Sequence, residues 1–398
     1  MVVAAVANHG QTASVYDNST SGFTSEQQEF FRSVRQLAKR LAKDLRRRDR
    51  ESIFDAEGWR LCAELGIQGL PIPEEYGGHG QSFTTSLAVL QALGEACPDN
   101  GLLFSLNAQI WSVQMPLLHF GTEEQRRRYL PAMCQGTLIG AHAMVEPDAG
   151  SDAMSLRTRA ILDGDSYLLR GSKIFVTNGP LADFAVVFAT VRPELKSLGV
   201  TAFLVDRDMP GVRFGPDVEK MGMRTSPLGE LFLDDVRVPI GQRLGPEGGG
   251  LRTFQRAMEY ERAFIFAAHL GAMRRLYGRC REYARTRQQF GQPISKFPAV
   301  ADRLIKMRMD IDLADLLLRR VAEVKDAGGE APMQAAMAKL FISEAWVQGS
   351  LDAIQIFGAY GYTTEYEVER EHRDAVASRL YSGTSEIQRK VIAHCLGL

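Results

Sequence analysis

Two carboxylates stand close together in the run Met258-Glu259-Tyr260-Glu261-Arg262, within a segment whose apolar residues recur at helical spacing. Residues two positions apart on a helix point to different faces, so Glu259 and Glu261 cannot both enter one site. A glutamate buried among apolar groups has a raised pKa, which suits it to remove a proton from a substrate. The alternative is a surface carboxylate paired with Arg262 or another basic neighbour. The run therefore indicates a candidate general base.

Three other segments carry residues suited to hold a flat ring or a diphosphate. In Ala143–Asp152, small residues and Gly150 let backbone N–H groups approach a ring closely. In Gly171–Asn178, Phe175 offers an aromatic face for stacking. In Arg285–Ile294, a planar guanidinium suits a diphosphate better than a lysine would. Taken singly, such segments could equally be turns or ordinary amphipathic strands, so their weight comes from their occurring together.

The segment Tyr381–Arg389 resembles the C-terminal motif of the acyl-CoA dehydrogenase flavoproteins, many of which carry a catalytic glutamate just before its Gly-Thr pair. Here that position is Ser382, whose hydroxyl is not a competent base at neutral pH. Isovaleryl-type members carry the glutamate on a long helix instead, in a Leu-Asp-x-Glu-Arg context. Glu261 matches that placement, 26 residues before Arg287. The resemblance therefore implies that Glu261 removes the α-proton of an acyl thioester while the β-hydride passes to flavin N5.

The three segments above, together with Gln355–Tyr362, are similar to the FAD-contacting segments of this family, and the resemblance covers the chain from about residue 24 to 398. The chain departs from the family at Val145, Phe175 and Ala359, where Thr, Trp and Gly are usual; Val145 loses one hydroxyl contact to the flavin. The residues that the resemblance implies for FAD are Met144, Val145, Gly150, Ser151, Phe175, Val176, Thr177, Arg287, Gln289, Phe290, Phe297, Gln355, Gly358, Ala359, Thr384 and Glu386. Those implied for the thioester are Ser151, Arg262, Ser382 and Gly383, with the backbone N–H of Ser382 stabilising the enolate oxygen.

The activity implied is FAD-dependent dehydrogenation of an acyl thioester of CoA or of a carrier protein. The chain also resembles dehydrogenases of secondary metabolism that act on carrier-bound amino-acyl, prolyl or hydroxymalonyl groups, for which the oxidised bond could be C–N or C–O instead of Cα–Cβ. Flavin reoxidation would need an acceptor such as an electron-transfer flavoprotein. Two alternatives stay open: a flavin oxidase or monooxygenase on the same fold, and a non-catalytic FAD-binding homologue. Ser382 argues against the nitroalkane-oxidising branch, which uses an aspartate near this position.

The elements that must position these residues form three regions after a disordered tail at 1–23. Residues 24–135 show helical periodicity, 136–245 contain short β-rich runs separated by Gly and Asp turns, and 246–398 show helical periodicity again. Within this last region, after a first long helix, further helical runs are expected at about 297–325, 331–358 and 365–396. This order predicts an α+β fold with an N-terminal helical domain, a middle β-barrel-like domain and a C-terminal four-helix bundle. No βαβ alternation occurs, which excludes a doubly wound nucleotide-binding fold.

One long helix is predicted from about residue 250 to Arg287, because no proline occurs between Pro246 and Pro293. Such a helix would separate Glu261 from Arg287 by about 39 Å at ~1.5 Å per residue. A base at the flavin ring and an arginine on the same cofactor's pyrophosphate cannot lie that far apart. Arg287 would therefore serve the FAD of a neighbouring subunit, which predicts a homo-oligomer, and the resemblance suggests a dimer of dimers, that is, a tetramer.

The bulk composition agrees with a cytoplasmic enzyme and excludes other classes. A net charge of −1 argues against nucleic-acid binding, and no apolar run is long enough to span a membrane. Residues 1–22 lack the features of a signal or transit peptide. The five cysteines and seven histidines show no metal-binding spacing, so we expect no metal site and buried, reduced thiols.

Overall fold

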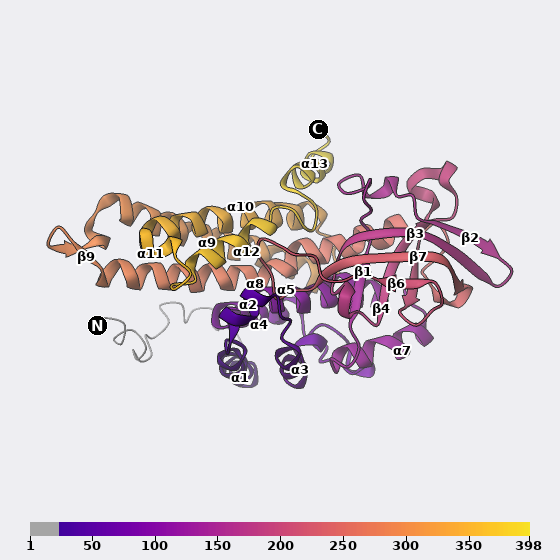
Figure 1. Cartoon of the computed structure of the whole chain (residues 1–398), viewed down its shortest axis with the longest axis horizontal. Coiled ribbons are helices and arrows are strands. Elements are labelled where there is room, and N and C mark those ends of the chain that lie inside the picture. The colour runs from indigo at the N-terminus through magenta and orange to yellow at the C-terminus, as the bar shows by residue number, and fades with distance from the viewer. Residues whose placement is uncertain (1–23) are drawn as a thin grey trace.

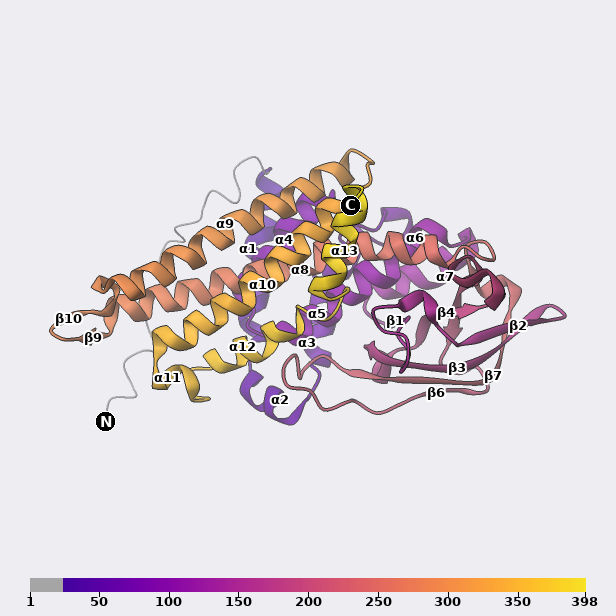
Figure 2. The same cartoon turned by 90° about the horizontal axis from the view of Figure 1, so that it is seen from above.

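The computed structural model describes residues 24–398, in which helices, then a β sheet, then further helices follow one another along the chain (Figure 1). The α+β fold class is confirmed. The tail predicted at 1–23 lies outside the described residues. The C-terminal helices form an elongated bundle, with the sheet at one end of it and the N-terminal helices along its side (Figures 1 and 2).

The N-terminal helices begin at polar caps that satisfy their first N–H groups. Ser82 and Asp99 cap α4 and α5, and Thr122 and Gln125 form a capping box on α7. These helices are α1 (Ser25–Leu41), α2 (Leu45–Glu51), α3 (Ala56–Glu64), α4 (Phe83–Ala96), α5 (Asn100–Gln109), α6 (Met115–Phe120) and α7 (Glu123–Cys134).

A π-helical turn, η4 (Ile110–Gln114), joins α5 to α6 without a break, and all five of its residues are buried. A π turn inserts an extra residue into the helical repeat and so rotates the side chains that follow. Trp111 of this turn stacks on Phe264, with 4.6 Å between the ring centroids, and the next residue, Ser112, faces the same neighbouring helix.

The middle region is an eight-stranded sheet with the order β6-β7-β3-β2-β4-β5-β8, and β1 pairs with β4. Among the described strands of this sheet, only the pairings of β4 with β1 and β2 are parallel, so the sheet is not doubly wound. Its strands are β1 (Gly140–Ala143), β2 (Arg159–Asp163), β3 (Ser166–Thr177), β4 (Phe184–Thr190), β5 (Val200–Asp206), β6 (Val212–Phe214), β7 (Leu228–Pro239) and β8 (Arg243–Leu244).

The C-terminal bundle is built on α8 (Gly250–Thr286), the long helix that the sequence predicts. The two helices that pack beside it, α9 and α10, begin and end within a residue or two of the predicted bounds (Figure 2). The other elements of this region are β9 (Gln288–Gln289), β10 (Gln292–Pro293), α9 (Pro298–Asp326), α10 (Pro332–Phe357), α11 (Ala359–Tyr362), α12 (Val368–Ala377) and α13 (Ser385–Cys395).

The helical run expected at 365–396 is wrong as one helix, because it is interrupted between α12 and α13. Ser382 and Gly383 in the interruption have φ values of 55° and 84°, which a right-handed helix cannot contain. The interruption places the Ser-Gly pair in a loop beside Glu261 and Arg262, in the N-terminal third of α8.

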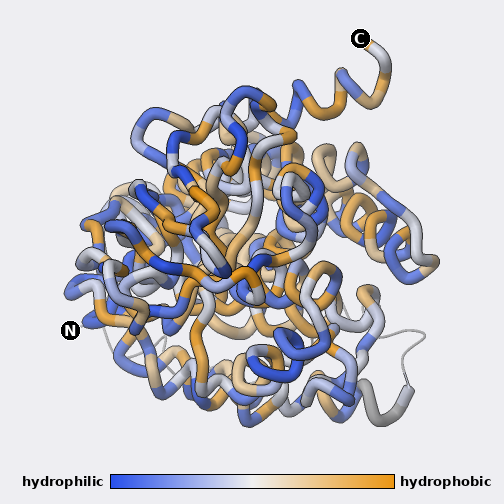
Figure 3. Tube along the Cα trace, turned by 90° about the vertical axis from the view of Figure 1, so that its right-hand side faces the viewer, coloured by the Kyte–Doolittle hydropathy of each residue, from blue (hydrophilic) through white to orange (hydrophobic). Residues whose placement is uncertain are grey.

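Hydrophobic residues pack between the helices and strands, and many of the outer turns are hydrophilic (Figure 3). Four cysteines are buried, but Cys395 is exposed because it lies in the last turn of the projecting helix α13; the expectation of a buried thiol is wrong for it. Across the described residues, no cluster of His, Cys, Asp and Glu could hold a metal, and no helix is long and apolar enough to cross a membrane.

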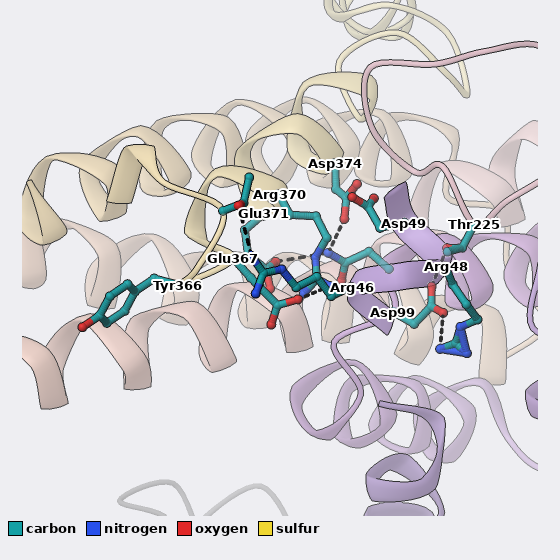
Figure 4. A network of polar contacts seen from close by, with 12 residues as sticks. Arg46, Arg48, Asp49, Asp99, Thr225, Tyr366, Glu367, Arg370, Glu371 and Asp374 are labelled. Atoms are coloured by element: carbon teal, nitrogen blue, oxygen red, sulfur yellow. Dashed lines mark hydrogen bonds and ion pairs between the residues drawn. The ribbon is translucent and has the colours of Figure 1, made fainter. Parts of the chain in front are cut away.

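A buried polar network ties the three regions together (Figure 4). Asp99 at the start of α5 accepts a hydrogen bond from Arg48 at 3.0 Å and another from Thr225 in the loop before β7. The next residue, Asn100, donates to Glu371 of α12 at 3.1 Å. Because breaking such a network leaves buried charge unpaired, it holds the regions in one arrangement.

The helix α8 crosses α4 at close range through small residues. A side chain at Gly271 of α8 would clash with the carbonyl oxygen of Gln91, and one at Gly94 with that of Ala268. Gly278, two turns later on α8, has open space around the position of a Cβ. The crossing fixes the axial position of α8 against the N-terminal helices.

We expect the substitution Gly271→Ala to lower the free energy of unfolding by about 1–3 kcal/mol, because the added methyl group overpacks the crossing. Gly278→Ala, the control on the same helix, should raise it by ~0.5–1 kcal/mol through the better helix propensity of alanine. Urea unfolding of the two variants measures both changes. Equal effects of the two substitutions would show that the α4–α8 approach is not tightly constrained.

Candidate active site

The carboxylate of Glu261 is buried in the middle of the protein, with 9% of the residue exposed. It lies on α8 and accepts two hydrogen bonds of 2.7 Å: the hydroxyl of Ser112 donates to Oε2 and that of Ser382 donates to Oε1. These donors come from the π-helical turn and from the loop before α13. Three segments that are distant in sequence therefore meet at this carboxylate.

Burial raises the pKa of the Glu261 carboxyl above its ordinary value. The hydrogen bonds from Ser112 and Ser382 and the positive charges of Arg262 and Lys339 oppose the shift without cancelling it. A carboxylate whose pKa is raised by burial is a stronger base than an exposed glutamate.

Glu259 points to another face of α8, as the two-residue spacing predicts. Its carboxylate pairs with Lys325 at 2.8 Å and with Arg256 at 3.4 Å, and it also accepts from the backbone N–H of Ala331 at 2.5 Å. These contacts join α8 to α9 and the following loop. Glu259 therefore has a structural role, whereas Glu261 has the partners of a reactive group.

Side chains of two helices, Gln388 of α13 and Arg262 of α8, contact the loop that carries Ser382. Gln388 donates to the carbonyl oxygens of Ser382 and Gly383 at 3.0 and 2.7 Å, and Nε of Arg262 approaches the Ser382 carbonyl at 3.5 Å. Thr384 caps α13 through the backbone N–H of Ile387. The backbone N–H of Ser382 meets no acceptor among the described residues.

Tyr381, just before this loop, is fixed in a buried aromatic cluster. Its hydroxyl hydrogen-bonds to Nε2 of His269, and its ring packs on Phe104 with 4.5 Å between centroids. Burial lowers the pKa of His269 to about 3 and raises that of Tyr381 well above 10, so both groups are neutral. His269 is thus the packed core residue that its place in the helical pattern indicates.

A buried ion pair joins the segments around residues 145 and 175. Lys173 on β3 donates to Glu146 at 2.7 Å and to the carbonyl oxygen of Met144 at 3.1 Å. The backbone N–H of Ile174 donates to the carbonyl oxygen of Val145 at 2.9 Å. These bonds place Met144 and Val145 beside the end of β3.

Both members of this ion pair are strongly shielded from solvent. Burial lowers the pKa of Lys173 to about 8 despite the attraction of Glu146. Burial by itself raises the pKa of Glu146, but the charge and hydrogen bond of Lys173, with donors from Arg157 and Thr158, hold it below its ordinary value. The pair is therefore charged at neutral pH and anchors the loop.

Next to the Lys173–Glu146 pair, the side chain of Phe175 and the backbone at Gly150 are exposed. Phe175 lies at a bulge between β3 and β7 with φ 54° and is 59% exposed. Gly150 and Ser151 are exposed, and nothing lies within 4 Å of the Cβ position of Gly150. Val176 is buried and Thr177 is half-buried. An exposed aromatic ring beside an open glycine loop fits a flat heterocycle.

The other expected FAD residues lie at the far end of α8. Arg287 ends this helix, and its guanidinium lies 5.8 Å from the ring centroid of Tyr360 on α11. The β9–β10 hairpin presents Phe290, which is 93% exposed and 6.0 Å from the ring of Phe297. Gln289, Gln355, Gly358 and Ala359 are exposed in the same region.

The structure therefore divides the expected residues into two groups. Met144 to Thr177, Glu261, Arg262 and the loop from Ser382 to Glu386 lie toward the sheet, whereas Arg287 to Phe297 and Gln355 to Ala359 lie at the opposite end of the bundle (Figure 1). Glu261 and Arg287 are 26 residues apart on α8 and its C-terminal cap, which is about 39 Å at ~1.5 Å per residue.

Family models match the chain over nearly its whole described length. They are the acyl-CoA dehydrogenase N-terminal domain over residues 24–137, the middle domain over 141–236 and the C-terminal domain over 248–397. The chain belongs to the acyl-CoA dehydrogenase family. It is accordingly an FAD-dependent oxidoreductase that dehydrogenates acyl thioesters. The exposed ring of Phe175 beside the open Gly150 loop, and the exposed Arg287, are chemically suited to this cofactor.

Relatives act on carrier-bound substrates. An L-prolyl-[peptidyl-carrier protein] dehydrogenase of Pseudomonas fluorescens is 42% identical over 346 residues, which are 87% of this chain and 91% of that protein. The crystal structure of the prolyl acyl carrier protein oxidase AnaB superposes with a TM-score of 0.93 at 49% identity, covering 94% of this chain and 100% of that one. The structure of PigA with FAD and proline gives a TM-score of 0.91 at 35% identity, covering 94% and 98%.

Sequence reasoning did not find Ser112, the side-chain role of Ser382 or the Lys173–Glu146 pair. Ser112 is 149 residues from Glu261 and belongs to no motif, so no spacing could connect them. Lys173 and Glu146 both stand in the family-like segments, but a sequence does not reveal that the two charges face each other.

We expect Lys173→Met to lower the free energy of unfolding by about 3–5 kcal/mol, because it leaves the buried Glu146 charge without its cation. The amount of FAD retained per protein should fall as well, since the Lys173–Glu146 pair positions the loop Met144–Ser151, which we expect to contact the flavin ring. Urea unfolding and the ratio of flavin to protein absorbance measure the two effects.

Arg157→Met is the matched control, because it removes an exposed ion pair with Asp148 from the same loop. That change should stay within about 1 kcal/mol and leave the FAD content unchanged. If the two variants lose equal stability and flavin, the buried pair does not anchor the loop.

Proposed function

We propose that this protein dehydrogenates a small amino-acyl group held as a thioester on a carrier protein, with Glu261 as the base. The observation that carries the proposal is the buried Glu261 carboxylate beside the loop of Ser382. The carrier-bound substrate rests on the names of the relatives, two of which are prolyl-carrier enzymes. Glu259, the other carboxylate in the run, is unsuited because it is salt-bridged.

The reaction removes a proton and a hydride from the substrate. Glu261 accepts the α-proton, which the thioester carbonyl acidifies, and the electron pair of the broken C–H bond forms the new double bond. Bound FAD would supply the acceptor for the hydride that leaves the atom next to the α-carbon, and the loop Met144–Ser151 with Phe175 would hold its ring. The backbone N–H of Ser382 stabilises the charge that develops on the thioester oxygen. Arg262, Gly383 and Ser151 would line the thioester.

We assign the FAD isoalloxazine to the loop Met144–Ser151 and the strand end Phe175–Thr177 of one subunit. Arg287, with Gln289, Phe290, Phe297, Gln355, Gly358 and Ala359, would hold the diphosphate and adenosine of the cofactor bound to a neighbour. Thr384 and Glu386 would contact the cofactor at the start of α13.

The surface of α9 supports such an oligomer. Ile305, Met309, Leu313 and Leu316 recur every three or four residues along it and are 46–64% exposed. A continuous apolar row on one face of a helix marks an interaction surface. We propose that a second copy of the chain covers this face, and that the assembly is a tetramer.

One relative favours a second candidate, because the AnaB structure is described as that of an oxidase. In an oxidase the electrons pass to O₂ and yield peroxide, whereas a dehydrogenase passes them to a protein such as an electron-transfer flavoprotein. The base and the first half of the reaction are common to both. Peroxide release under air distinguishes them.

Glu261→Gln should lower the rate of anaerobic flavin bleaching by about 10²–10⁴-fold, because the amide cannot accept the α-proton. The measurement is stopped-flow bleaching of the purified yellow protein with prolyl and other acyl groups, each loaded on a carrier protein or on CoA. Bleaching by one thioester class identifies the substrate.

Glu259→Gln serves as the control, and its folding is checked by thermal denaturation because the change breaks a buried ion pair. It should bleach at nearly the parental rate. Bleaching by Glu261→Gln at the parental rate would remove Glu261 as the base, and a parent that no thioester bleaches would favour the non-catalytic alternative.

Mixing variants tests the neighbour's contribution to FAD binding. Glu261→Gln and Arg287→Ala should each be inactive as homo-oligomers, the second through lost FAD. Co-expressed with different tags and purified as hetero-oligomers, they should regain activity in sites that combine an intact Glu261 with an intact Arg287 from the other chain. No recovery would mean that both residues serve the same subunit's cofactor.

A further inference from the structure

The direct partners of Glu261 are two neutral hydroxyl groups from different parts of the chain. Ser112 occupies one carboxylate oxygen and Ser382 the other, both at 2.7 Å. A serine hydroxyl has one proton to donate, and each of these serines directs it to the carboxylate. The two bonds fix the plane of the carboxylate and leave further lone pairs for a substrate C–H group.

Among the described residues, no charged side chain forms a hydrogen bond or an ion pair with the Glu261 carboxylate. Arg262 on α8 reaches the carbonyl oxygen of Ser382, and the buried ammonium of Lys339 on α10 has no hydrogen-bond partner among the described residues. Burial lowers the pKa of Lys339 to about 8, so it is cationic at neutral pH. Tyr381, the residue before Ser382, is neutral, and its hydroxyl bonds to His269.

Neutral donors have a different effect from a cation. An adjoining Lys or Arg lowers a carboxyl pKa by about 1–3 units and weakens it as a base, whereas burial without any donor would leave the carboxyl protonated at neutral pH. Hydroxyl donors stabilise the ionised form less than a cation does and also orient it. Glu259, salt-bridged to Lys325 on the same helix, shows the arrangement that Glu261 avoids.

Ser382 has an unusual backbone conformation, in which its hydroxyl donates to the Glu261 carboxylate. Ser382 has φ 55°, a conformation that L residues adopt rarely, and the following Gly383 has φ 84°. Gln388, itself buried, donates to both carbonyl oxygens and holds this conformation. Strain that the surroundings maintain in this way is characteristic of functional positions.

We propose that Ser112 and Ser382 are positioning residues for the base: their hydroxyls orient the Glu261 carboxylate and keep it ionised in its buried site. The inference rests on the proposed function in taking Glu261 as the base. Position 382, where the resemblance places the catalytic glutamate of many relatives, thereby retains a part in proton removal without holding the base.

The test is the protonation midpoint of Glu261 in the FAD-loaded enzyme without substrate. Infrared difference titration follows the C=O band of the protonated carboxyl, identified by its absence in Glu261→Gln. Ser382→Ala and Ser112→Ala should each move the midpoint to higher pH by about one unit, because each removes a donor to the ionised form. The pH profile of anaerobic bleaching should shift in the same direction.

Two variants separate positioning from a general effect on folding. Ser112→Thr keeps a hydroxyl at a helical position and should have a midpoint near that of the parent, unlike Ser112→Ala. Ser378→Ala removes a buried hydroxyl that bonds to the carbonyl oxygen of Ala375 in α12, and it should leave the midpoint unchanged. If Ser382→Ala fails to fold, Ser112→Ala carries the same prediction from a separate segment.

Midpoints of Ser112→Ala and Ser382→Ala equal to that of the parent would overturn the inference. So would a shift of the same size in Ser378→Ala. Because the infrared titration needs no substrate, it gives its answer even if no thioester bleaches the flavin, and failure of the proposed function is then recognised separately.

Discussion

The burial of one carboxylate on α8 is the constraint to which the rest of the site is fitted. A charge taken out of water needs compensating donors, and the fold supplies them from the π-helical turn and from the loop before α13. Those donors are correctly placed only if α8 keeps its axial position. The close crossing at Gly94 and Gly271 and the polar network around Asp99 and Glu371 fix that position.

Similar residues take opposite roles according to their neighbours. Glu259 and Glu261 are two residues apart, yet Glu259 joins two helices as an ion pair and Glu261 meets only hydroxyls directly. In the middle region, Glu146 is salt-bridged to Lys173 and serves to hold a loop. The partner, more than the residue type, decides whether a buried carboxylate anchors the structure or remains reactive.

The length of α8 connects the site to the assembly. Glu261 lies in its N-terminal third and Arg287 caps its C-terminus, so the residues expected to hold one FAD are distributed over both ends of a long bundle. A rigid helix cannot bring its own ends together. The arrangement is consistent with a cofactor shared between subunits, and the apolar row on α9 provides a surface for a second copy.

Several features followed from the sequence by itself, because they depend on local periodicity and on motifs. The order of helices, strands and helices, the uninterrupted α8, the opposite faces of Glu259 and Glu261 and the family resemblance are of this kind. The break between α12 and α13 was missed because the segments on both sides of Ser382 are helical in pattern, and only its backbone conformation reveals the loop.

Only the tertiary structure decided which distant groups meet. Ser112 carries no motif, the hydroxyl of Ser382 gave no sign of a role, and nothing in the spacing pairs Lys173 with Glu146. The contacts of Ser112 and Ser382 with Glu261 cross more than a hundred residues, and they depend on the rotation of a π-helical turn and on the register of α8 against α4. These are set by close packing of the whole core, which a periodic pattern does not specify.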